Sequence, residues 1–361
     1  MLIIDSHLDL AWSAVRWNRD LTRSVAETRA AERNMAGPAR GTNTVTFPEL
    51  RKAEVAVCVA TVLARAGGAG DEKLDHRTQE IAYAAAQGQL AYYRVMESQG
   101  RVHMLRDLGA LEDHLARWEN GGRESGPLGF ILSMEGADPI VAPGQLAQWW
   151  EDGLRAIGLA HFGVGAYAHG TGTSGGLTSR GFDLLRAMEE LGVILDVTHL
   201  ADESFWQAVE KFHGPVLASH NNCRSLVPGD RQFGDEQLRY LIQRGAVIGA
   251  VCDAWMLFPG WVRGETSNVS VTIETIVNHI DHVCQLAGNA RHSAIGSDLD
   301  GGFGTEQCPS DLDTIADLQK ITEILRQRGY AQADVESIMH GNWLRFFREA
   351  WAPREKTARH Q

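Results

Sequence analysis

The sequence predicts an α/β protein built as one (β/α)₈ barrel of the TIM type. Two neighbouring runs, Val193–His199 and Pro215–His220, are short, rich in Val, Ile and Leu, and each ends on a histidine. A helix-like stretch, Glu203–Phe212, separates them, and this order is typical of two parallel strands joined by a crossover helix. Because parallel strands end at the same edge of a sheet, we expect His199 and His220 side by side at one rim.

The same alternation of strand and helix patterns continues along the rest of the chain. We expect six further strands, at Leu2–Ile4, Val55–Leu63, Phe130–Met134, Ala156–Ala160, Ala246–Cys252 and Ala294–Gly296. Helices are expected at Lys73–Gln99, Leu108–Trp118, Leu146–Asp152, Phe182–Leu191, Asp235–Arg244, Ile273–Leu286, Asp311–Arg328 and Gln332–Trp351. Eight β/α repeats favour a closed barrel. The rival doubly wound sheet would carry a glycine-rich turn after its first strand, where this chain reads DSHLD.

The chain shows no break in composition, so we expect a single domain over residues 1–351 and a polar tail over 352–361. Two loops are expected to be long. The first follows the first strand to about Glu49, with some helix, and contains Trp12 and Trp17. The second, Gly163–Gly181, follows the fourth strand and is dense in glycine, which resists a packed element.

Composition limits the classes of function. The net charge of the 361 residues is −12, which disfavours binding to nucleic-acid phosphates. Membrane insertion is not expected, because no stretch approaches the roughly 20 apolar residues that a span requires. The five cysteines form no CxxC pair and are expected to be buried free thiols. Together with the lack of a leader-like start, this predicts a cytoplasmic protein. Ten tryptophans make a homo-oligomer a reasonable expectation.

Ionisable residues stand at the carboxyl ends of most predicted strands, where barrels carry their active sites. They are His7, Asp9, Glu135, His161, His199, His220 and Asp298. Gathered at one mouth without a cation, these groups would carry a large cost of desolvation and repulsion. Imidazoles and carboxylates together suit zinc or a similar divalent ion. The pattern therefore predicts a metal centre.

The spacing suggests how such a centre would be shared. Residues i and i+2 of a strand point the same way, so His7 and Asp9 can hold one ion. His199 and His220 can hold a second from the opposite side, and Glu135 has two oxygens with which to bridge. Two metal ions about 3.5–4 Å apart with a shared hydroxide form a hydrolytic centre. The remaining histidines are read as ordinary surface or core residues.

Several motifs occur in one order over nearly the whole chain. They are DSHLD (5–9), SMEGAD (133–138), GLAH (158–161), DVTHL (196–200), ASHNNCRSL (218–226), PGDRQ (228–232), IGSDLDGG (295–302) and HGNWLRFF (340–347). On these motifs the sequence resembles the membrane (renal) dipeptidase family, a zinc peptidase branch of the amidohydrolase-like barrels. The resemblance implies a (β/α)₈ barrel, two zinc ions per chain, and hydrolysis of the peptide bond of dipeptides by a metal-bridging hydroxide.

Position by position, the resemblance implies that His7 and Asp9 hold one zinc ion. His199 and His220 would hold the other, and Glu135 would bridge the two.

The resemblance also implies roles around the metal centre. His161 would contact the substrate and stabilise the oxyanion, and Asp298 would carry the proton from the hydroxide to the leaving amine. Arg231 would bind the carboxylate of the dipeptide, with Arg224 as the alternative anchor. Arginine suits this task because its planar fork matches a carboxylate.

The chain departs from the family pattern at a few positions. Ser6 and Leu8 replace the Gly and Asn of the usual DGHND start. The tyrosine expected after the seventh strand is missing, and Trp255 is expected to line the pocket instead.

Two other functions stay open at this point. One is a different hydrolase of the superfamily, acting on a lactone, a cyclic amide or a phosphoester. Many such enzymes use HxH and a bridging lysine, whereas this chain has HxD and a glutamate. The other is a barrel that binds a metal or small molecule without catalysis.

Overall fold

The computed structural model describes residues 1–67 and 75–352, and it confirms the predicted barrel. Eight parallel strands pair in the order β10-β11-β1-β2-β6-β7-β8-β9. The ring closes between β9 and β10, where the Gly249 amide donates to the Ala218 carbonyl over 2.9 Å. The barrel strands are β1 (Ile3–Leu8), β2 (Val55–Leu63), β6 (Leu128–Glu135), β7 (Leu154–Gly158), β8 (Ile194–Asp196), β9 (Val216–Leu217), β10 (Ile248–Ala250) and β11 (Ser293–Ile295).

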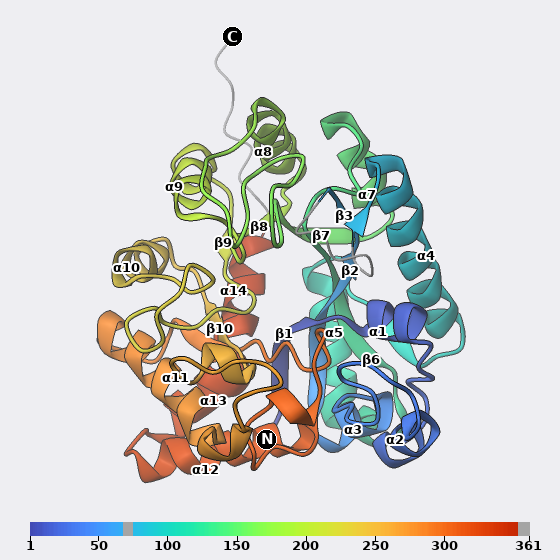
Figure 1. Ribbon diagram of the computed structural model, residues 1–361, viewed down its shortest axis with the longest axis vertical. Coiled ribbons are helices and arrows are strands. Elements are labelled where there is room, and N and C mark those ends of the chain that lie inside the picture. Colours follow the sequence, from blue (N-terminus) through green and yellow to red (C-terminus); the bar gives the residue numbers. More distant parts are fainter. Residues whose placement is uncertain (68–74, 353–361) are drawn as a thin grey trace.

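Helices surround the strands on the outside, as Figure 1 shows for α4, α7, α8, α9, α10 and α11. Their apolar faces and the strands form one continuous core. The helices are α1 (Leu10–Trp17), α2 (Val25–Glu32), α3 (Phe47–Lys52), α4 (Gln79–Ser98), α5 (Leu108–Arg117), α6 (Arg123–Ser125), α7 (Leu146–Glu151), α8 (Ser179–Leu191), α9 (Asp202–Lys211), α10 (Asp235–Gln243), α11 (Ile273–Ala287), α12 (Lys320–Gln327), α13 (Gln332–Glu336) and α14 (Asn342–Ala350).

Some elements differ from the expectation. Val102–Met104 forms an additional strand, β5, which pairs with β6 beside the barrel path. A short pair, β3 (Arg65–Ala66) with β4 (Asp75–His76), follows β2. Helix α4 begins only at Gln79, because Thr78 caps it through a bond from the Ile81 amide. The predicted start of this helix at Lys73, and the predicted tail beyond residue 352, lie outside the described residues.

The strands that were expected to end on histidines are shorter than predicted. β8 ends at Asp196 and β9 at Leu217, so His199 and His220 lie in the turns beyond them. Beyond these ends the Asp196 Oδ1 accepts the amides of Thr198 at 3.0 Å and Ser219 at 3.1 Å, so a side chain bonds the two turns in place of the ladder.

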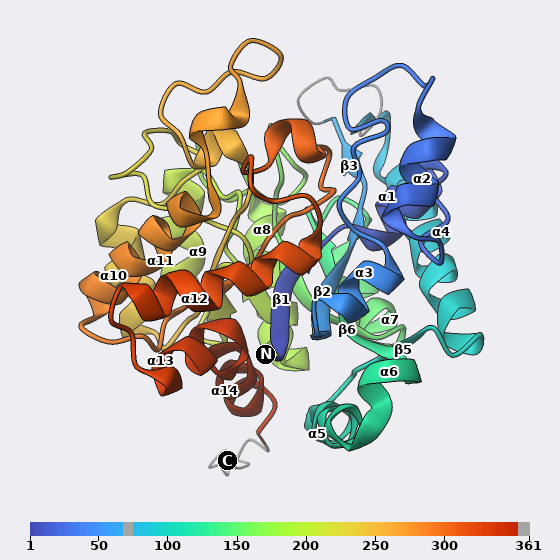
Figure 2. The same ribbon diagram turned by 90° about the horizontal axis from the view of Figure 1, so that it is seen from below.

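The two long loops beyond the carboxyl ends of the strands differ in their helix content. The segment after β1 is more helical than expected, since α1, α2 and α3 occupy much of it. It is tied to the end of β11 by Asp300, whose carboxylate accepts the Thr44 and Val45 amides at 2.7 and 3.0 Å. Gly163–Gly181 forms only isolated bridges before α8 begins, so the predicted loop is confirmed. Figure 2 shows the blue segment around α2 and the orange segments after β10 rising on the same side, away from the N-terminus.

The cysteines and the helix lengths agree with what the composition predicts. All five cysteines are buried and free, as predicted. Among the described residues, the helices fall short of the length and apolar character that crossing a bilayer would demand.

The buried His279 on α11 generates a prediction about acid stability. Its Nδ1 accepts the Cys223 amide at 3.0 Å, and burial, followed by the charge of His282, lowers its pKa to about 3. Below pH 6.5 the unfolded chain therefore takes up a proton that the folded chain refuses, and stability falls by about 1.4 kcal/mol per pH unit for this group.

We expect His279→Asn, which keeps an acceptor in place, to lose less free energy of unfolding between pH 7 and pH 5 than the parent protein. Urea titrations at pH 7, 6 and 5 measure this. Equal losses in both proteins would contradict the assignment.

Candidate metal centre

The predicted ligands converge at the carboxyl end of the barrel around one carboxylate, that of Glu135. This residue ends β6 and is 8% exposed. Its Oε1 faces the Nε2 atoms of four imidazoles, and these distances are 3.5 Å to His7, 3.6 Å to His161, 3.2 Å to His199 and 3.3 Å to His220. Residues that are far apart in the sequence thus share one small volume.

The ligand atoms form overlapping groups. His7, Asp9 and Glu135 make one, and Glu135, His199 and His220 make another; within each group the atoms lie within 4.8 Å of one another. The two groups meet at Glu135, which is the arrangement that the spacing predicts.

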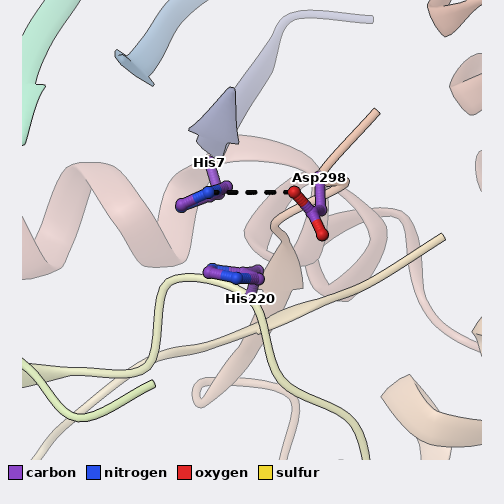
Figure 3. A group of neighbouring side chains, drawn as sticks. All are labelled: His7, His220 and Asp298. Carbon is purple, nitrogen blue, oxygen red and sulfur yellow. Dashed lines mark ion pairs between the residues drawn. The ribbon is translucent and has the colours of Figure 1, made fainter. Parts of the chain in front are cut away.

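A third group consists of His7, His220 and Asp298, shown in Figure 3. The two imidazole rings lie one above the other with centroids 3.6 Å apart, and Asp298 Oδ1 is 3.8 Å from His7 Nε2. Asp298 therefore stands beside the ligand cluster, as the sequence analysis expects of it.

The residues present fit divalent cations. His7 Nε2 is buried and lacks a hydrogen-bond partner among the described residues, although three carboxylates surround it. The Nε2 atoms of His199 and His220 are 3.2 Å apart and both point at Glu135. Imidazole nitrogens and carboxylate oxygens aimed at a common point are the usual ligand set of zinc.

The electrostatics of the cluster point the same way. Burial would lower the pKa of His7, but Glu135, Asp9 and Asp298 outweigh it and raise that pKa to about 10. Burial and the charge of Glu135 raise the pKa of Asp9 to about 7. Burial also raises the pKa of Asp298 well above its usual value, with Glu135 adding to the effect. Without a cation the acids and imidazoles must share protons, and divalent ions can take the place of those protons.

A second layer of hydroxyl groups holds the ligands. The Thr61 hydroxyl donates to Asp9. Thr171 Oγ1 lies 3.1 Å from His199 Nδ1, and Ser219 Oγ lies 2.8 Å from His220 Nδ1. None of these three residues was predicted, because Ser and Thr have no diagnostic spacing. Ser219 could have been suspected only from its place next to His220.

Ser6, which departs from the family pattern, lies beneath the cluster. Its hydroxyl donates to the Ser219 carbonyl and lies 3.1 Å from the Ile295 carbonyl. A Cβ at Gly249 or Gly296 would stand 2.6 or 2.7 Å from Ser6 Oγ, so these two positions need glycine. The serine therefore joins β1 to β11 and to the turn after β9 under the site.

His161 is held by an arginine that the sequence analysis also missed. Arg65 Nη1 lies 3.3 Å from His161 Nδ1, and Arg65 Nε is 2.7 Å from Asp75 Oδ1. Because a guanidinium only donates, Nδ1 must accept, and the ring proton must be on Nε2. His161 consequently presents an N–H toward the centre of the cluster.

The structure distinguishes the two candidate arginines. Arg231 is buried and lines the cavity; its Nη2 donates to the His220 carbonyl at 3.0 Å, and its Nη1 lacks a hydrogen-bond partner in the described chain. Arg224 instead forms a two-point ion pair with Asp202, at 2.7 and 2.9 Å, outside the cavity lining. Arg231 is the arginine available to a ligand.

Two site residues have left-handed backbones, with φ of 68° at His199 and 57° at Asp298. Such conformations are uncommon outside glycine and cost about 1–3 kcal/mol when the surroundings impose them. Here Thr171 Oγ1 bonds to the His199 carbonyl at 3.3 Å, and the Asp298 amide bonds to the His7 carbonyl at 3.3 Å. The strain aims both side chains into the cluster.

The cluster opens into a cavity of about 880 Å³. Besides site residues, its lining includes Trp12 and Trp17 of the segment after β1, and Trp255, which was expected there. The Trp255 indole N–H donates to Asp253 at 2.7 Å, which fixes the ring at the mouth.

Comparisons with known sequences agree on one family. The model of the membrane dipeptidase family (peptidase family M19) matches residues 1–361. An uncharacterised protein of the pqqA 5′ region of Klebsiella pneumoniae is 31% identical over 239 residues, which are 63% of this chain and 84% of that protein. Dipeptidase verJ of Clonostachys rogersoniana is 28% identical over 228 residues, 61% of this chain and 55% of the fungal protein.

Comparisons with solved structures agree on the fold. A metallopeptidase from Rhodobacter sphaeroides, liganded with a phosphinate mimic of the dipeptide L-Ala-D-Ala, superposes with a TM-score of 0.80. It is 21% identical, with 97% of this chain and 99% of that chain covered. Dipeptidase AC, a metallopeptidase of family M19, gives a TM-score of 0.78 at 21% identity, over 98% and 99% of the two chains.

The hydroxyl layer generates a prediction about metal affinity. We expect Thr171→Val to weaken zinc binding about 10- to 100-fold, because outer partners that orient a ligating histidine have effects of this size. The measurement is a competition titration of zinc against a chromophoric chelator.

Thr173→Val is the matched control, since Thr173 is in the same loop and, within the described part of the chain, its hydroxyl bonds only to the Gly170 carbonyl, at 2.7 Å. If both variants bound zinc as tightly as the parent protein, Thr171 would have no role at the metal centre.

Proposed function

Since this chain belongs to the membrane dipeptidase family (peptidase family M19), we propose that its barrel mouth holds two zinc ions and hydrolyses the peptide bond of dipeptides. As a member of this family the chain is a metallo-dipeptidase. The observation that carries the proposal is the pair of candidate ligand groups that share Glu135, with Asp9, Glu135 and His199 in the lining of one cavity.

The proposed ligands of one ion are His7 and Asp9, those of the other are His199 and His220, and Glu135 belongs to both. When bound, such ions polarise the peptide carbonyl and make a water nucleophilic near neutral pH. The hydroxyl layer of Thr61, Thr171 and Ser219 keeps the ligands in place.

Among the arginines that line the cavity, Arg231 suits one end of a dipeptide. Arg231 is buried and lines the cavity, and its Nη1 has no hydrogen-bond partner among the described residues. A buried guanidinium donor without an acceptor is costly, and a carboxylate would satisfy it with a charge-assisted bond. We assign Arg231 to the carboxylate of the substrate, which would explain a restriction to short peptides with a free C-terminus.

Two further groups suit the reaction itself. The Nε2–H of His161 is available to the negative charge that develops on the carbonyl oxygen, a type of contact worth about 3–4 kcal/mol. Asp298 stands beside His7 with its carboxylate in the cavity lining, where it can accept the proton of the attacking water and return it to the leaving amine.

The decisive test is hydrolysis of a dipeptide panel by the zinc-loaded protein. We expect turnover of dipeptides, its loss after dialysis against a chelator, and its return when zinc is added. A lactone and a phosphotriester serve as comparison substrates. Turnover of these but not of any dipeptide would refute the proposal.

Asp298→Asn isolates the proton carrier. We expect kcat to fall about 10²- to 10⁴-fold, the usual contribution of general acid–base catalysis, with zinc content retained. Asp202→Asn is the control, because Asp202 pairs with Arg224 away from the cavity. Undiminished kcat in Asp298→Asn would remove this residue from the mechanism.

A further inference from the structure

The cavity is larger than the reacting groups of a dipeptide require. Its volume of about 880 Å³ lies near the upper end of the roughly 300–1,000 Å³ typical of pockets that enclose drug-sized ligands. The lining includes site residues, namely Asp9, Glu135, His161, His199, Arg231 and Asp298. The remaining wall must therefore contact the side chains of the substrate.

The order of the strands gives the substrate a direction. Arg231 is bonded to the backbone of His220, directly after β9. In the ring of eight strands, β2 is four places from β9, so the ends of these two strands lie across the mouth from each other. A dipeptide whose carboxylate binds Arg231 and whose peptide bond lies over Glu135 would extend its first residue toward the end of β2.

The wall at the end of β2 includes an apolar, aromatic surface beside Arg40 and Arg65. Leu63, the last residue of β2, pairs in register with Glu135 and so stands next to the metal ligands. Leu63, Trp12, Trp17 and Ala39 form an apolar cluster separate from the main core. The indole rings of Trp12 and Trp17 are 5.0 Å apart, and both residues line the cavity together with Leu63.

This wall is rigid. Helix α1, which carries both tryptophans, begins directly after Asp9. The Trp17 ring is covered by the guanidinium of Arg19 at 4.2 Å, and Arg19 is held by Glu32 at 2.8 Å. A preformed apolar surface gains affinity by removing apolar atoms of the ligand from water at little cost in ordering.

We propose that Trp12, Trp17 and Leu63 form the subsite for the first residue of the dipeptide and select a large apolar or aromatic side chain there. This inference rests on the proposed dipeptidase function. It names the class of substrate: dipeptides such as Leu-Ala and Phe-Ala rather than Gly-Ala or Glu-Ala.

Arg65 suggests an alternative specificity, in which this subsite would favour an acidic side chain of the first residue. The structure argues against it, because Arg65 is already engaged by Asp75 at 2.7 Å and lies beside His161. Arg40 also lines the cavity, but its Nη1 already donates to the Trp17 carbonyl at 2.7 Å and to Glu32 at 2.8 Å.

The test is kcat/KM of the zinc-loaded protein on Phe-Ala, Leu-Ala, Ala-Ala, Gly-Ala, Glu-Ala and Ala-Phe. We expect Phe-Ala and Leu-Ala to exceed Ala-Ala and Gly-Ala at least tenfold, and Phe-Ala to exceed Ala-Phe. Equal values for Phe-Ala and Ala-Ala, a preference for Glu-Ala, or a gain confined to Ala-Phe would overturn the inference. Turnover of small dipeptides in any of these cases would leave the proposed function standing, whereas no turnover of any dipeptide would refute both.

Variants of the wall residues test whether they cause the preference for a large first side chain. In Trp12→Ala and in Leu63→Ala the ratio of Phe-Ala to Ala-Ala should fall toward one, and Trp12→Phe should retain most of it. Trp206→Ala is the control, because Trp206 lies on α9 with 37% of its surface exposed. Calorimetric titration of zinc-loaded Asp298→Asn should give a lower Kd for Phe-Ala than for Ala-Ala. An unchanged ratio in both wall variants would contradict the assignment.

Discussion

The arrangement of the molecule depends on one buried carboxylate, Glu135, in the middle of four imidazoles. An ionised Glu135 alone would lose the solvation of its charge on burial, and the imidazoles alone would repel one another if they were protonated. A closed parallel barrel is the framework that can bring them together, because every strand delivers its carboxyl end to the same mouth. The hydroxyls of Thr61, Thr171 and Ser219 bond to three of the proposed ligand side chains and hold their orientation. The left-handed backbone at His199 directs its ring into the cluster.

The same ring geometry gives the site a direction. Arg231 lies on the β9 side and the Trp12–Trp17–Leu63 wall lies on the β2 side, with Glu135 and its partners between them. A cationic end, a reactive centre and an apolar end in that order match a short peptide with one free carboxylate. The long segment after β1 thereby does more than connect two strands, because it supplies the apolar end of the pocket.

The sequence was sufficient for the parts of the structure that repeat. The alternation of apolar runs and amphipathic stretches predicted the barrel, and placing polar residues at strand ends brought Glu135 and His220 to one mouth. What escaped prediction depends on contacts between distant segments. Asp196 bonds to amides in the turns after β8 and β9, and Arg65 of β3 contacts His161, which is 96 residues away in the sequence. Threonine and serine partners of ligands leave no pattern in a sequence.

The most direct test of the account is a crystal structure of the zinc-loaded protein with diffraction measured on both sides of the zinc absorption edge. The account predicts two anomalous peaks per chain at the barrel mouth, one beside His7 and Asp9 and one beside His199 and His220, with Glu135 in contact with both. Zinc bound only to surface histidines, or a mouth that stays without zinc in protein soaked with excess metal, would contradict it.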